Sequence, residues 1–292
     1  MENDCVKNLS IIIPARNEAE GLRRLLPELV TILPDAEIIV VNDGSTDDTA
    51  EICHQYGATT ITHPYGMGNG TAIKAGARVA QGEILIFMDA DGQHQPQDIP
   101  RLIEKLTQGY DMVVGARDKD SQAGLHRAIA NGFYNRLASW MVGQKVADLT
   151  SGLRVVKASK FRKFLYMLPN GFSYPTTITM SFFRAGYAVG YEPIHAPKRI
   201  GNSHMRIVRD GVRFLLIIFK IGSLYSPLKL FFPITVFFLL MGMGHYLYTF
   251  LTIHRFTNMS ALLFITAMLI FLIGLVSEQI TMLAYRDSES NM

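Results

Sequence analysis

Two long stretches without a charged side chain constrain this sequence more than any other feature. No Asp, Glu, Lys or Arg occurs from Leu230 to Ile253, and none occurs from Phe256 to Ser277. A helix needs about 20 apolar residues to cross a bilayer, so both stretches are long enough. Both are also apolar on every face, unlike the amphipathic helices of a soluble core. We therefore expect two transmembrane helices, at residues 228–253 and 256–280, within a hairpin of residues 227–285.

Positive charge gathers immediately before the first apolar stretch. Residues 198–229 contain seven Lys or Arg and a single acid, Asp210. Basic residues beside a spanning helix mark its cytoplasmic end. With a short turn at His254 and Arg255, two crossings return a tail of residues 286–292 to the cytoplasm. We therefore expect an integral, multi-pass membrane protein whose N-terminal domain and both termini are cytoplasmic.

The basic residues of this segment alternate with apolar ones at helical spacing, which predicts an amphipathic juxtamembrane helix over residues 206–226, lying on the bilayer surface. The net charge of +3 reflects this local segment. No aromatic-rich basic module of the nucleic-acid-binding kind is present, so we expect no nucleic acid partner. The first ten residues lack the apolar core of a signal peptide. Cys5 and Cys53 are expected to be reduced thiols.

Residues 1–110 alternate between short apolar runs and helical patterns. The runs expected as strands are "LSIIIPARN", with its strand stopping at Pro14, "EIIVVNDGS", "ATTITH" and "EILIFMDAD". The helical patterns between them are "EAEGLRRLLPELVTIL", "TDDTAEICHQYG" and "GMGNGTAIKAGARVAQG". This alternation predicts an α/β domain with a mostly parallel sheet. Ligands of such sheets bind outside the carboxyl ends of the strands, so Pro14 to Glu18, Asn42 to Ser45 and Asp89 to Gln93 should share one cleft.

After residue 110 the pattern is mixed. "DMVVGAR" predicts a strand ending at Arg117, and "HRAIANGFYNRLASWMVG" predicts a helix. "VADLTSGLRVVKA" indicates a loop entering a strand, and "FRKFLYMLP" a short helix. "YAVGYEPIHAPKR" contains two prolines, which an edge strand tolerates. We expect residues 1–205 to form one catalytic domain.

The stretch "FMDADGQHQP" places two carboxylates, Asp89 and Asp91, at the end of a buried strand. They point to one face because the side-chain period of a strand is two, and Gln93 joins them if the chain stays extended past Gly92. Two like charges so close raise each other's pKa unless a cation lies between them. Their oxygen ligands suit Mg²⁺ or Mn²⁺. The alternative is a solvated turn with acidic caps, which the neighbouring strand ends disfavour.

Other strand ends carry residues that suit a nucleotide. Asp43 can accept hydrogen bonds from a base or a ribose. Pro14 and Ala15 lie where backbone can face a nucleobase, and Glu18 lies near a ribose. The glycines from Gly66 to Gly70 have the spacing G-x-G-x-G, which is not the dinucleotide fingerprint. They fit a loop that approaches a ligand and a flexible connection equally well.

These motifs follow one another in the order and spacing of inverting family-two glycosyltransferases. The chain resembles in particular the polyprenyl-phosphate and dolichyl-phosphate sugar synthases, over residues 8–205 and the hairpin. The Asp-X-Asp is common to many nucleotide-sugar enzymes. "DLTSGLR", with "GAR" upstream and "RIGNSH" downstream, is more specific to the lipid-phosphate branch.

The resemblance implies a GT-A fold, which is Rossmann-like, binding a UDP- or GDP-linked sugar and a polyprenyl phosphate at the bilayer. It implies nucleoside contacts at Pro14, Ala15, Glu18 and Asp43, and metal or diphosphate contacts at Asp89, Asp91 and Gln93. It implies contacts to the acceptor phosphate or donor diphosphate at Arg117, Arg127, Asn131 and Arg199. Substrate contacts are further expected at Asp148, Ser203 and His204. Asp89, Asp91 and Arg117 are expected to carry catalysis.

Two departures from the family pattern stand out. The family's G-x-S-K is Gly201-Asn202-Ser203-His204 here, so an ever-charged Lys is replaced by a His that titrates near neutral pH. No acid occurs between Asn170 and Phe183, where the family often has one. The sugar, the nucleotide, the polyprenol, the choice of metal and any homo-oligomeric state remain open.

The mechanism implied by the resemblance follows from the acceptor. A phosphate monoester has a second pKa near 6, so it is largely dianionic at pH 7 and needs no general base. Arginines would position it, a metal would stabilise the leaving diphosphate, and attack from behind would invert the anomeric carbon. A processive polysaccharide synthase needs a Gln-X-X-Arg-Trp motif, but the only tryptophan is Trp140 in "LASWM". A soluble nucleotidyltransferase would not need the hairpin, and a non-catalytic scaffold would not need an intact Asp-X-Asp.

Overall fold

The structure is a computed structural model that describes residues 8–117, 125–171, 174–196, 223 and 225–290. The side chains of residues 125–131 and 284–290 are not among those described. The chain divides into two compact units, Met1–His204 and Met205–Met292. Most of the predicted amphipathic helix, residues 206–222 and 224, lies outside the described residues.

The N-terminal unit is built on one seven-stranded sheet with the order β3-β2-β1-β4-β6-β5-β7. Only β6 runs antiparallel to its neighbours, so the predicted mostly parallel sheet is confirmed. Among the described strands β7 pairs with β5 alone and is an edge strand, as its prolines predict. The strands are β1 (Leu9–Ala15), β2 (Glu37–Asn42), β3 (Thr59–Thr62), β4 (Ile84–Phe87), β5 (Met112–Arg117), β6 (Arg154–Lys157) and β7 (Val189–Ile194).

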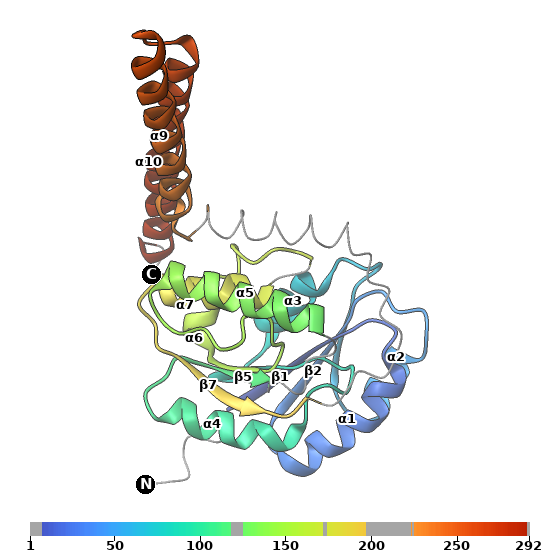
Figure 1. Cartoon of the computed structure of the whole chain (residues 1–292). Helices are drawn as coiled ribbons and strands as arrows, with labels where there is room; N and C mark the ends of the chain where they lie inside the picture. The colour runs from blue at the N-terminus through green and yellow to red at the C-terminus, as the bar shows by residue number, and fades with distance from the viewer. Residues whose placement is uncertain (1–7, 118–124, 172–173, 197–222, 224, 291–292) are drawn as a thin grey trace. The chain divides into compact units, whose positions relative to one another are not determined.

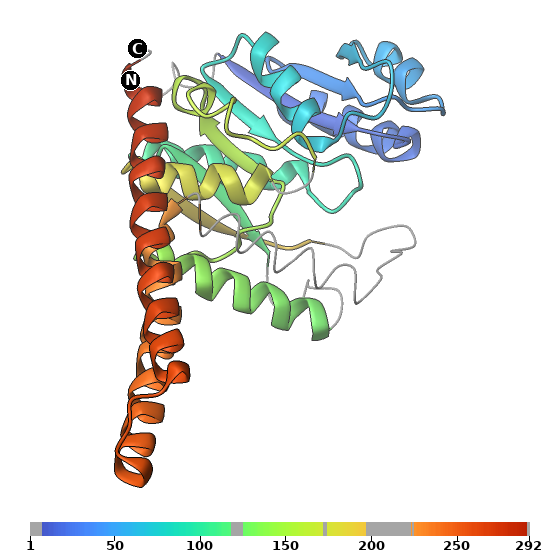
Figure 2. The ribbon, with the colours of Figure 1, turned by 90° about the horizontal axis from the view of Figure 1, so that it is seen from above.

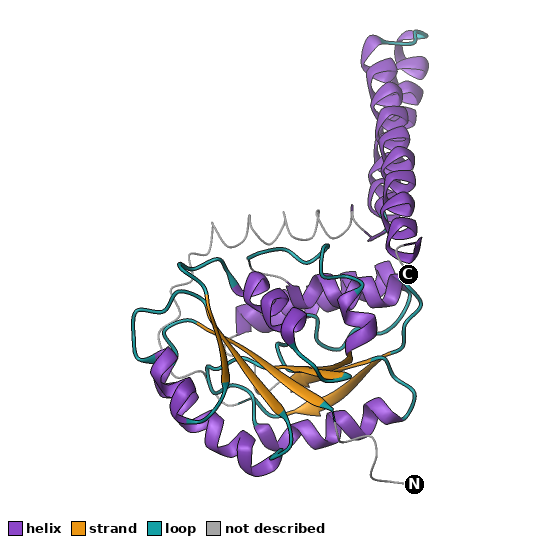
Figure 3. Ribbon diagram, turned by 180° about the vertical axis from the view of Figure 1, so that it is seen from behind, coloured by secondary structure: helices purple, strands orange, loops and turns teal. Residues whose placement is uncertain are grey.

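Helices cover both faces of this sheet (Figures 1 and 3). On one side lie α1 (Ala19–Ile32), α2 (Thr49–Gln55), the 3-10 turn η1 (Pro96–Asp98) and α4 (Ile99–Thr107). On the other side lie α3 (Asn69–Val79), α5 (Leu125–Val142), α6 (Ala158–Arg162) and α7 (Tyr174–Arg184). The predicted apolar stripe of α1 is buried against the sheet, through Leu22, Leu25, Leu26 and Leu29.

Three elements differ from the sequence-based expectation. β1 continues through Pro14 to Ala15, and its pairing with β4 ends earlier, at Ile12 and Phe87, so no ladder bond needs the missing proline N–H. α6 spans Ala158–Arg162, so it begins before the short helix predicted over "FRKFLYMLP", and most of that segment forms turns. α7 was not predicted, because its β-branched "TTIT" disfavours a helix and packing in the core overrides that preference.

The C-terminal unit is a pair of long helices, α9 (Pro227–Ile253) and α10 (Asn258–Ser290), joined by a short turn at residues 254–257. Figure 2 shows them side by side. Each contains a span long and apolar enough to cross a membrane, with only 6% and 22% of the most apolar segment buried. The two helices pack closely where Gly242 meets Leu263 and Phe264. The two predicted spans are present, although α10 extends past the predicted end near residue 280.

Candidate active site

The chain turns sharply just after β4, where the two predicted metal-binding carboxylates lie. Gly92 has a φ of 74°, in the left-handed region that favours glycine. The backbone N–H of Gln93 donates to Asp91 Oδ1 at 3.1 Å, which closes a turn around the Asp91 side chain. The extended-strand condition on which Gln93 was expected to join Asp89 and Asp91 is therefore not met. A metal contact from Gln93 stays a prediction.

His94 packs against the backbone of this turn. Its side chain is buried, and its Nδ1 accepts a hydrogen bond from the backbone N–H of Asp89 at 3.1 Å. Burial lowers the pKa of His94 to about 4, although the charge of Asp91 opposes that change. The imidazole is therefore neutral near pH 7, with its remaining proton on Nε2. His94 fixes the backbone from which Asp89 projects.

The loops after β1 and β2 are bound to one another. Asn17, with a φ of 56°, accepts the Thr46 N–H on its Oδ1 at 2.8 Å and donates its own N–H to the Ser45 hydroxyl at 3.0 Å. The Glu18 N–H donates to Thr49 Oγ1 at 3.1 Å. Ala15 accepts the Asp43 N–H on its carbonyl at 2.8 Å. Two of the three expected strand-end segments thus form one surface.

The carboxylate of Asp43 holds the loop that follows β3. It accepts the N–H groups of Met67 and Gly68, both at 2.8 Å, and lies 2.8 Å from Nδ1 of His63. Burial alone would raise the pKa of Asp43, but these hydrogen bonds outweigh it and lower the pKa. The carboxylate is thus ionised near neutral pH and is engaged by the protein's own backbone.

The glycine-rich loop approaches protein backbone. A Cβ added at Gly70 would lie 1.9 Å from the carbonyl oxygen of Pro169, and one at Gly68 would lie 2.6 Å from that of Asn170. The Gly70 N–H donates to the carbonyl of Gly171 at 3.1 Å. Gly68 and Gly70 therefore allow two chain segments to touch, which neither of the alternatives left open by the sequence had anticipated.

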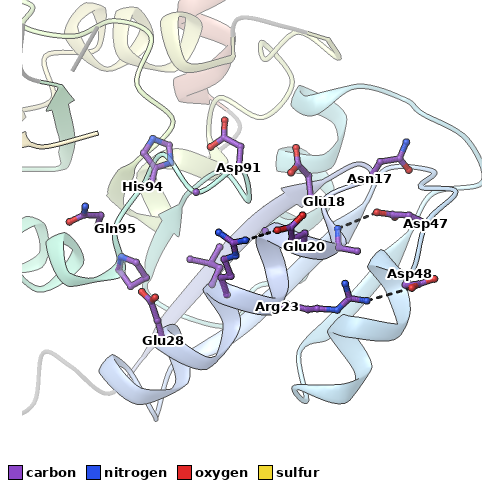
Figure 4. Close-up of a pocket in the computed structure, with 16 residues that line it drawn as sticks. Asn17, Glu18, Glu20, Arg23, Glu28, Asp47, Asp48, Asp91, His94 and Gln95 are labelled. Atoms are coloured by element: carbon purple, nitrogen blue, oxygen red, sulfur yellow. Dashed lines mark hydrogen bonds and ion pairs between the residues drawn. The ribbon is translucent and has the colours of Figure 1, made fainter. Parts of the chain in front are cut away.

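A cleft of about 640 Å³ lies between α1, the start of α2 and the turn after β4. Figure 4 shows Glu18 and Asp91 among the residues that line it, with Arg23 and Glu28 farther along α1. Segment 42–45 does not line this cleft, so the cleft takes in only part of the expected constellation. The turn after β4 still packs on α1, because a Cβ at Gly21 would lie 2.1 Å from the carbonyl oxygen of Ala90.

Arg117, at the end of β5, forms a two-pronged ion pair with Asp148. Its Nε donates to one carboxylate oxygen at 2.8 Å and its Nη2 to the other at 3.1 Å, while Nη2 also donates to Thr150 Oγ1 at 2.6 Å. Burial would lower the pKa of Arg117, but Asp148 and the charges of Asp89 and Asp91 raise it. Burial would raise the pKa of Asp148, but Arg117 lowers it. Both groups are therefore charged.

A fully buried arginine, Arg154, binds the loop that carries Asp148. Arg154 is 0% exposed and donates to the carbonyls of Ser151 and Leu149, at 2.9 and 3.2 Å, and to Thr179 Oγ1 at 2.5 Å. The same loop touches the turn after β4, because a Cβ at Gly152 would lie 2.2 Å from Asp89 Oδ2. Gly152 therefore joins the Arg117–Asp148 pair to the Asp89 carboxylate.

Five of the predicted site residues have side chains outside those that the structure describes. Arg127 and Asn131 belong to α5, but their side chains lie outside the described residues. Arg199, Ser203 and His204 lie outside them altogether. Their expected contacts with phosphate stay predictions.

The sequence interpretation missed the residues that support the site. These are His94, Gly152, Arg154 and, on α5, Asn135, which donates to the carbonyl of Ala147 at 2.7 Å and accepts the Leu149 N–H at 3.0 Å. The sequence contained one signal for Arg154. An arginine between Leu153 and Val155, in a strand buried on both sides, needs hydrogen-bond acceptors inside the protein.

The donor set after β4 fits a hard divalent cation. Asp89 and Asp91 offer only oxygen atoms, and the nearby imidazole nitrogen of His94 is occupied by a backbone N–H. Within the described ranges no group of three or more His, Cys, Asp or Glu side chains could hold a metal ion. Mg²⁺ typically needs only one or two carboxylates when substrate phosphates complete its coordination. The pair thus suits a metal that arrives with a phosphate-bearing ligand.

Comparison with protein-family models gives two matches. Residues 10–165 match glycosyl transferase family 2, and residues 226–283 match the GtrB C-terminal hairpin. The second match and the two apolar helices together make the chain a membrane protein.

Curated relatives include two proteins named undecaprenyl-phosphate 4-deoxy-4-formamido-L-arabinose transferase. The one from Pectobacterium carotovorum subsp. carotovorum (strain PC1) is 32% identical over 210 residues, covering 68% of this chain and 63% of that protein. The one from Klebsiella pneumoniae (strain 342) is 31% identical over 217 residues, covering 70% and 64%. The chain therefore spans less than two thirds of the length of these relatives.

Among solved structures, glucosyl-3-phosphoglycerate synthase from Mycobacterium tuberculosis in complex with phosphoglyceric acid has a TM-score of 0.60 and 19% identity, covering 74% of this chain and 79% of that one. The same enzyme with Mn²⁺, uridine diphosphate and glucosyl-3-phosphoglycerate has a TM-score of 0.61. At this identity the likeness establishes the GT-A type of fold alone. With a family match over more than half its length, the chain belongs to glycosyl transferase family 2.

Proposed function

We propose that this chain is a membrane-bound inverting glycosyltransferase that moves a hexose from a nucleoside diphosphate sugar to a polyprenyl or dolichyl phosphate. The observation that carries the proposal is the contact between Gly152 and Asp89, which brings the Arg117–Asp148 pair beside the carboxylates after β4. A carboxylate site next to a cation suits two phosphate-bearing substrates that must meet. The relatives named as undecaprenyl-phosphate transferases support the acceptor class.

The donor side is formed by the ends of β1, β2 and β4. Pro14 and Ala15 offer backbone to the base, and Glu18 lies at the start of α1 to face the ribose. Asp43 fixes the loop from His63 to Gly68 on this side, and it stays a predicted nucleoside contact. The neighbouring synthase structure that contains Mn²⁺ and uridine diphosphate supports a nucleotide donor.

Asp89 and Asp91, with Gln93, would hold Mg²⁺ or Mn²⁺ on this side. When bound, such a cation supplies positive charge that stabilises a leaving diphosphate. The chain's own contribution is rigidity: His94 holds the backbone N–H of Asp89, and Asp91 closes its turn onto Gln93. The backbone that carries Asp89 and the carboxylate of Asp91 are therefore held by the protein itself.

The acceptor side is formed by the end of β5 and the loop before β6. A lipid phosphate is largely dianionic at pH 7, so its oxygen can attack without a general base. Arg117, held by Asp148, would orient that phosphate, with Arg127, Asn131, Arg199, Ser203 and His204 as further predicted contacts. Attack from the face opposite the leaving diphosphate forms the new carbon–oxygen bond as the old one breaks, which inverts the anomeric carbon.

We place the catalytic domain at residues 1–205, the juxtamembrane helix at 206–226, the hairpin at 227–285 and the tail at 286–292, with both termini cytoplasmic. The hairpin would hold the site at the bilayer. Removing residues 228–292 should therefore reduce transfer to a long-chain lipid phosphate in membranes more than transfer to a short soluble analogue. Equal losses on the two acceptors would contradict this role.

The direct test is an assay of membranes that contain the full chain. Polyprenyl phosphate, Mg²⁺ or Mn²⁺ and a panel of labelled UDP- and GDP-sugars are supplied, and label in the lipid phase is measured. We expect one donor to give a lipid-phosphate sugar of inverted anomeric configuration, and none with the Asp89→Asn chain. Absence of transfer from every donor in the panel would overturn the proposed function.

A further inference from the structure

The outward face of α5 exposes two large aromatic side chains. Phe133 is 60% exposed and Trp140 is 49% exposed. Residues seven apart lie on the same face of a helix, and the exposed Arg136 lies on that face as well. The opposite face of α5 is buried, through Tyr134, Ala138 and Met141. The helix therefore has one side packed in the fold and one aromatic side turned outward.

The charged residues of the segment that carries this aromatic face are all of one sign. From Ser121 to Ala147 the sequence contains no Asp or Glu. Arg136 and Lys145, the latter just beyond the end of the helix, are both exposed. Aromatic rings with Lys or Arg and no acids are typical of helices that lie in the interface of a bilayer. Trp favours that interface because its ring is amphipathic.

We propose that the face of α5 formed by Phe133, Arg136 and Trp140 contacts the surface of a bilayer that contains anionic phospholipid. Two observations favour this occupant over a second protein surface. The chain carries two bilayer-length helices of its own, so its N-terminal unit works close to lipid. The positive charge without acids complements anionic headgroups, which attract Lys and Arg near a membrane surface.

Two half-buried residues of α5 connect this helix to the candidate active site. Asn135 and the Ser139 hydroxyl hold residues 146–149, the latter by accepting the Val146 N–H at 2.9 Å. That segment carries Asp148, which binds Arg117. One helix thus presents its outer face to lipid while its inner face positions the arginine. This link rests on the proposed function, whereas the contact with lipid rests only on exposure, charge and the hairpin.

Trp140 is the only tryptophan in the chain, so its fluorescence reports this surface without labelling. The full chain is placed in nanodiscs whose phospholipids are brominated near the top of the acyl chains, with an anionic fraction included. We expect loss of Trp140 emission with brominated lipid and protection from iodide in the buffer. Quenching by iodide but not by brominated lipid would show a solvent-facing surface and overturn the proposal. Quenching by neither would show a protein-covered surface and overturn it as well.

A matched control moves the single tryptophan to another exposed position. Tyr56 is 40% exposed at the end of α2, which packs against β3 at the opposite edge of the sheet. In the Trp140→Phe, Tyr56→Trp chain we expect quenching by iodide and none by brominated lipid. Equal quenching of both chains by brominated lipid would overturn the assignment to α5. The readout needs neither donor nor acceptor, so it fails or succeeds independently of the proposed function.

The charge argument has its own test. Loss of one basic side chain weakens attraction to an anionic membrane about fivefold. We expect Arg136→Glu to reduce quenching by brominated lipid in anionic nanodiscs, and to reduce it much less in nanodiscs of zwitterionic lipid alone. The same quenching in wild type and Arg136→Glu at every lipid composition would overturn the role given to anionic lipid.

Discussion

The two halves of the sheet use their polar residues in different ways. In the parallel half, β3-β2-β1-β4, acidic side chains that follow the strands bind backbone N–H groups of neighbouring loops. Asp43 binds Met67 and Gly68, and Asp47 binds the Ala19 N–H at 3.2 Å. In the half that contains the antiparallel strand, β6-β5-β7, two arginine cations are each held from several sides. Arg117 is one of them, and the fully buried Arg154 is the other.

This difference gives the two halves opposite roles at one edge of the sheet. The parallel half ends in carboxylates, which can attract a phosphate only through a metal cation. The other half brings its own positive charge, so it can attract a phosphate directly. The two meet where Gly152 lies against Asp89. A reaction between two phosphate-bearing substrates needs both the carboxylate surface and the cationic surface. Substitutions can change either surface, or the junction between them, separately.

The largest effect is expected from removing one charge in the parallel half. Asp91→Asn keeps the shape and the turn onto Gln93 but halves the charge offered to a cation. Loss of such a transition-state electrostatic contact typically lowers turnover ~10²–10³-fold. Sugar transfer is measured with Mg²⁺, with Mn²⁺ and in EDTA. Asp48→Asn is the control, because Asp48 lines the same cleft but is paired with Arg23 in an exposed ion pair. Near-normal turnover of Asp91→Asn, or of wild type in EDTA, would contradict the metal site.

The next effect is expected in the other half, from Arg154→Met. The change leaves the buried carbonyl oxygens of Leu149 and Ser151 without their hydrogen-bond donor, and each such loss costs about 1–3 kcal/mol. Relief from burying a guanidinium offsets part of that cost, so we expect a net loss of roughly 2–3 kcal/mol in the free energy of unfolding. Denaturant unfolding of the detergent-solubilised chain measures it.

Arg162→Met is the matched control for Arg154. Arg162 also donates to two carbonyls, those of Ala77 and Ala80, but it is exposed, so water can replace it. We expect the control to lose much less stability. Similar losses in the two variants would show that burial is not what distinguishes Arg154.

The junction between the halves is tested by Gly152→Ala. The added Cβ would lie 2.2 Å from Asp89 Oδ2, so the carboxylate or the loop must shift. Overpacking of this kind typically costs about 1–3 kcal/mol. We expect weaker Mn²⁺ binding by titration and a raised KM for the acceptor, since both sides of the junction move. Gly171→Ala, where a Cβ meets open space, should change neither. Unchanged Mn²⁺ affinity in Gly152→Ala would show that the Asp89 side chain is not set by this contact.

The parallel half of the fold could be predicted from the sequence, and the other half only in part. β1, β2 and β4 are apolar runs that local pattern identifies, and the two spans follow from composition. The antiparallel placement of β6 between β4 and β5 depends on long-range pairing that no local pattern records. α7 contradicts its own local preferences.

The same division holds for the candidate site. Strand-end residues such as Asp89 could be named because parallel strands bring their carboxyl ends to one edge. What a named residue binds could not be deduced. Asp43 was expected to contact the nucleoside, and that contact stays a prediction. The sequence did not reveal that Asp43 also binds Met67 and Gly68, because a loop distant in sequence folds back over it. Gly152 and Arg154 act through contacts that exist only once β6 is inserted.

The smallest expected effect is the removal of the Asp43 charge in the parallel half. In Asp43→Asn one of the two oxygens becomes an NH₂ group that must face a backbone N–H, so about 1 kcal/mol of unfolding free energy should be lost. The folded-state pKa of Asp43 is lowered by its hydrogen bonds to His63, Met67 and Gly68, which outweigh burial. A lowered pKa contributes stability above the unfolded pKa, about 3.9, and that contribution is lost as the pH falls through the folded value. The stability gap between wild type and Asp43→Asn, followed by denaturant unfolding from pH 7 to pH 3, should therefore narrow below about pH 4. Asp48→Asn, in its exposed ion pair, should show a small gap throughout. A gap for Asp43→Asn that stays constant over this range would mean that the shape of the side chain, and not its charge, holds the loop after β3.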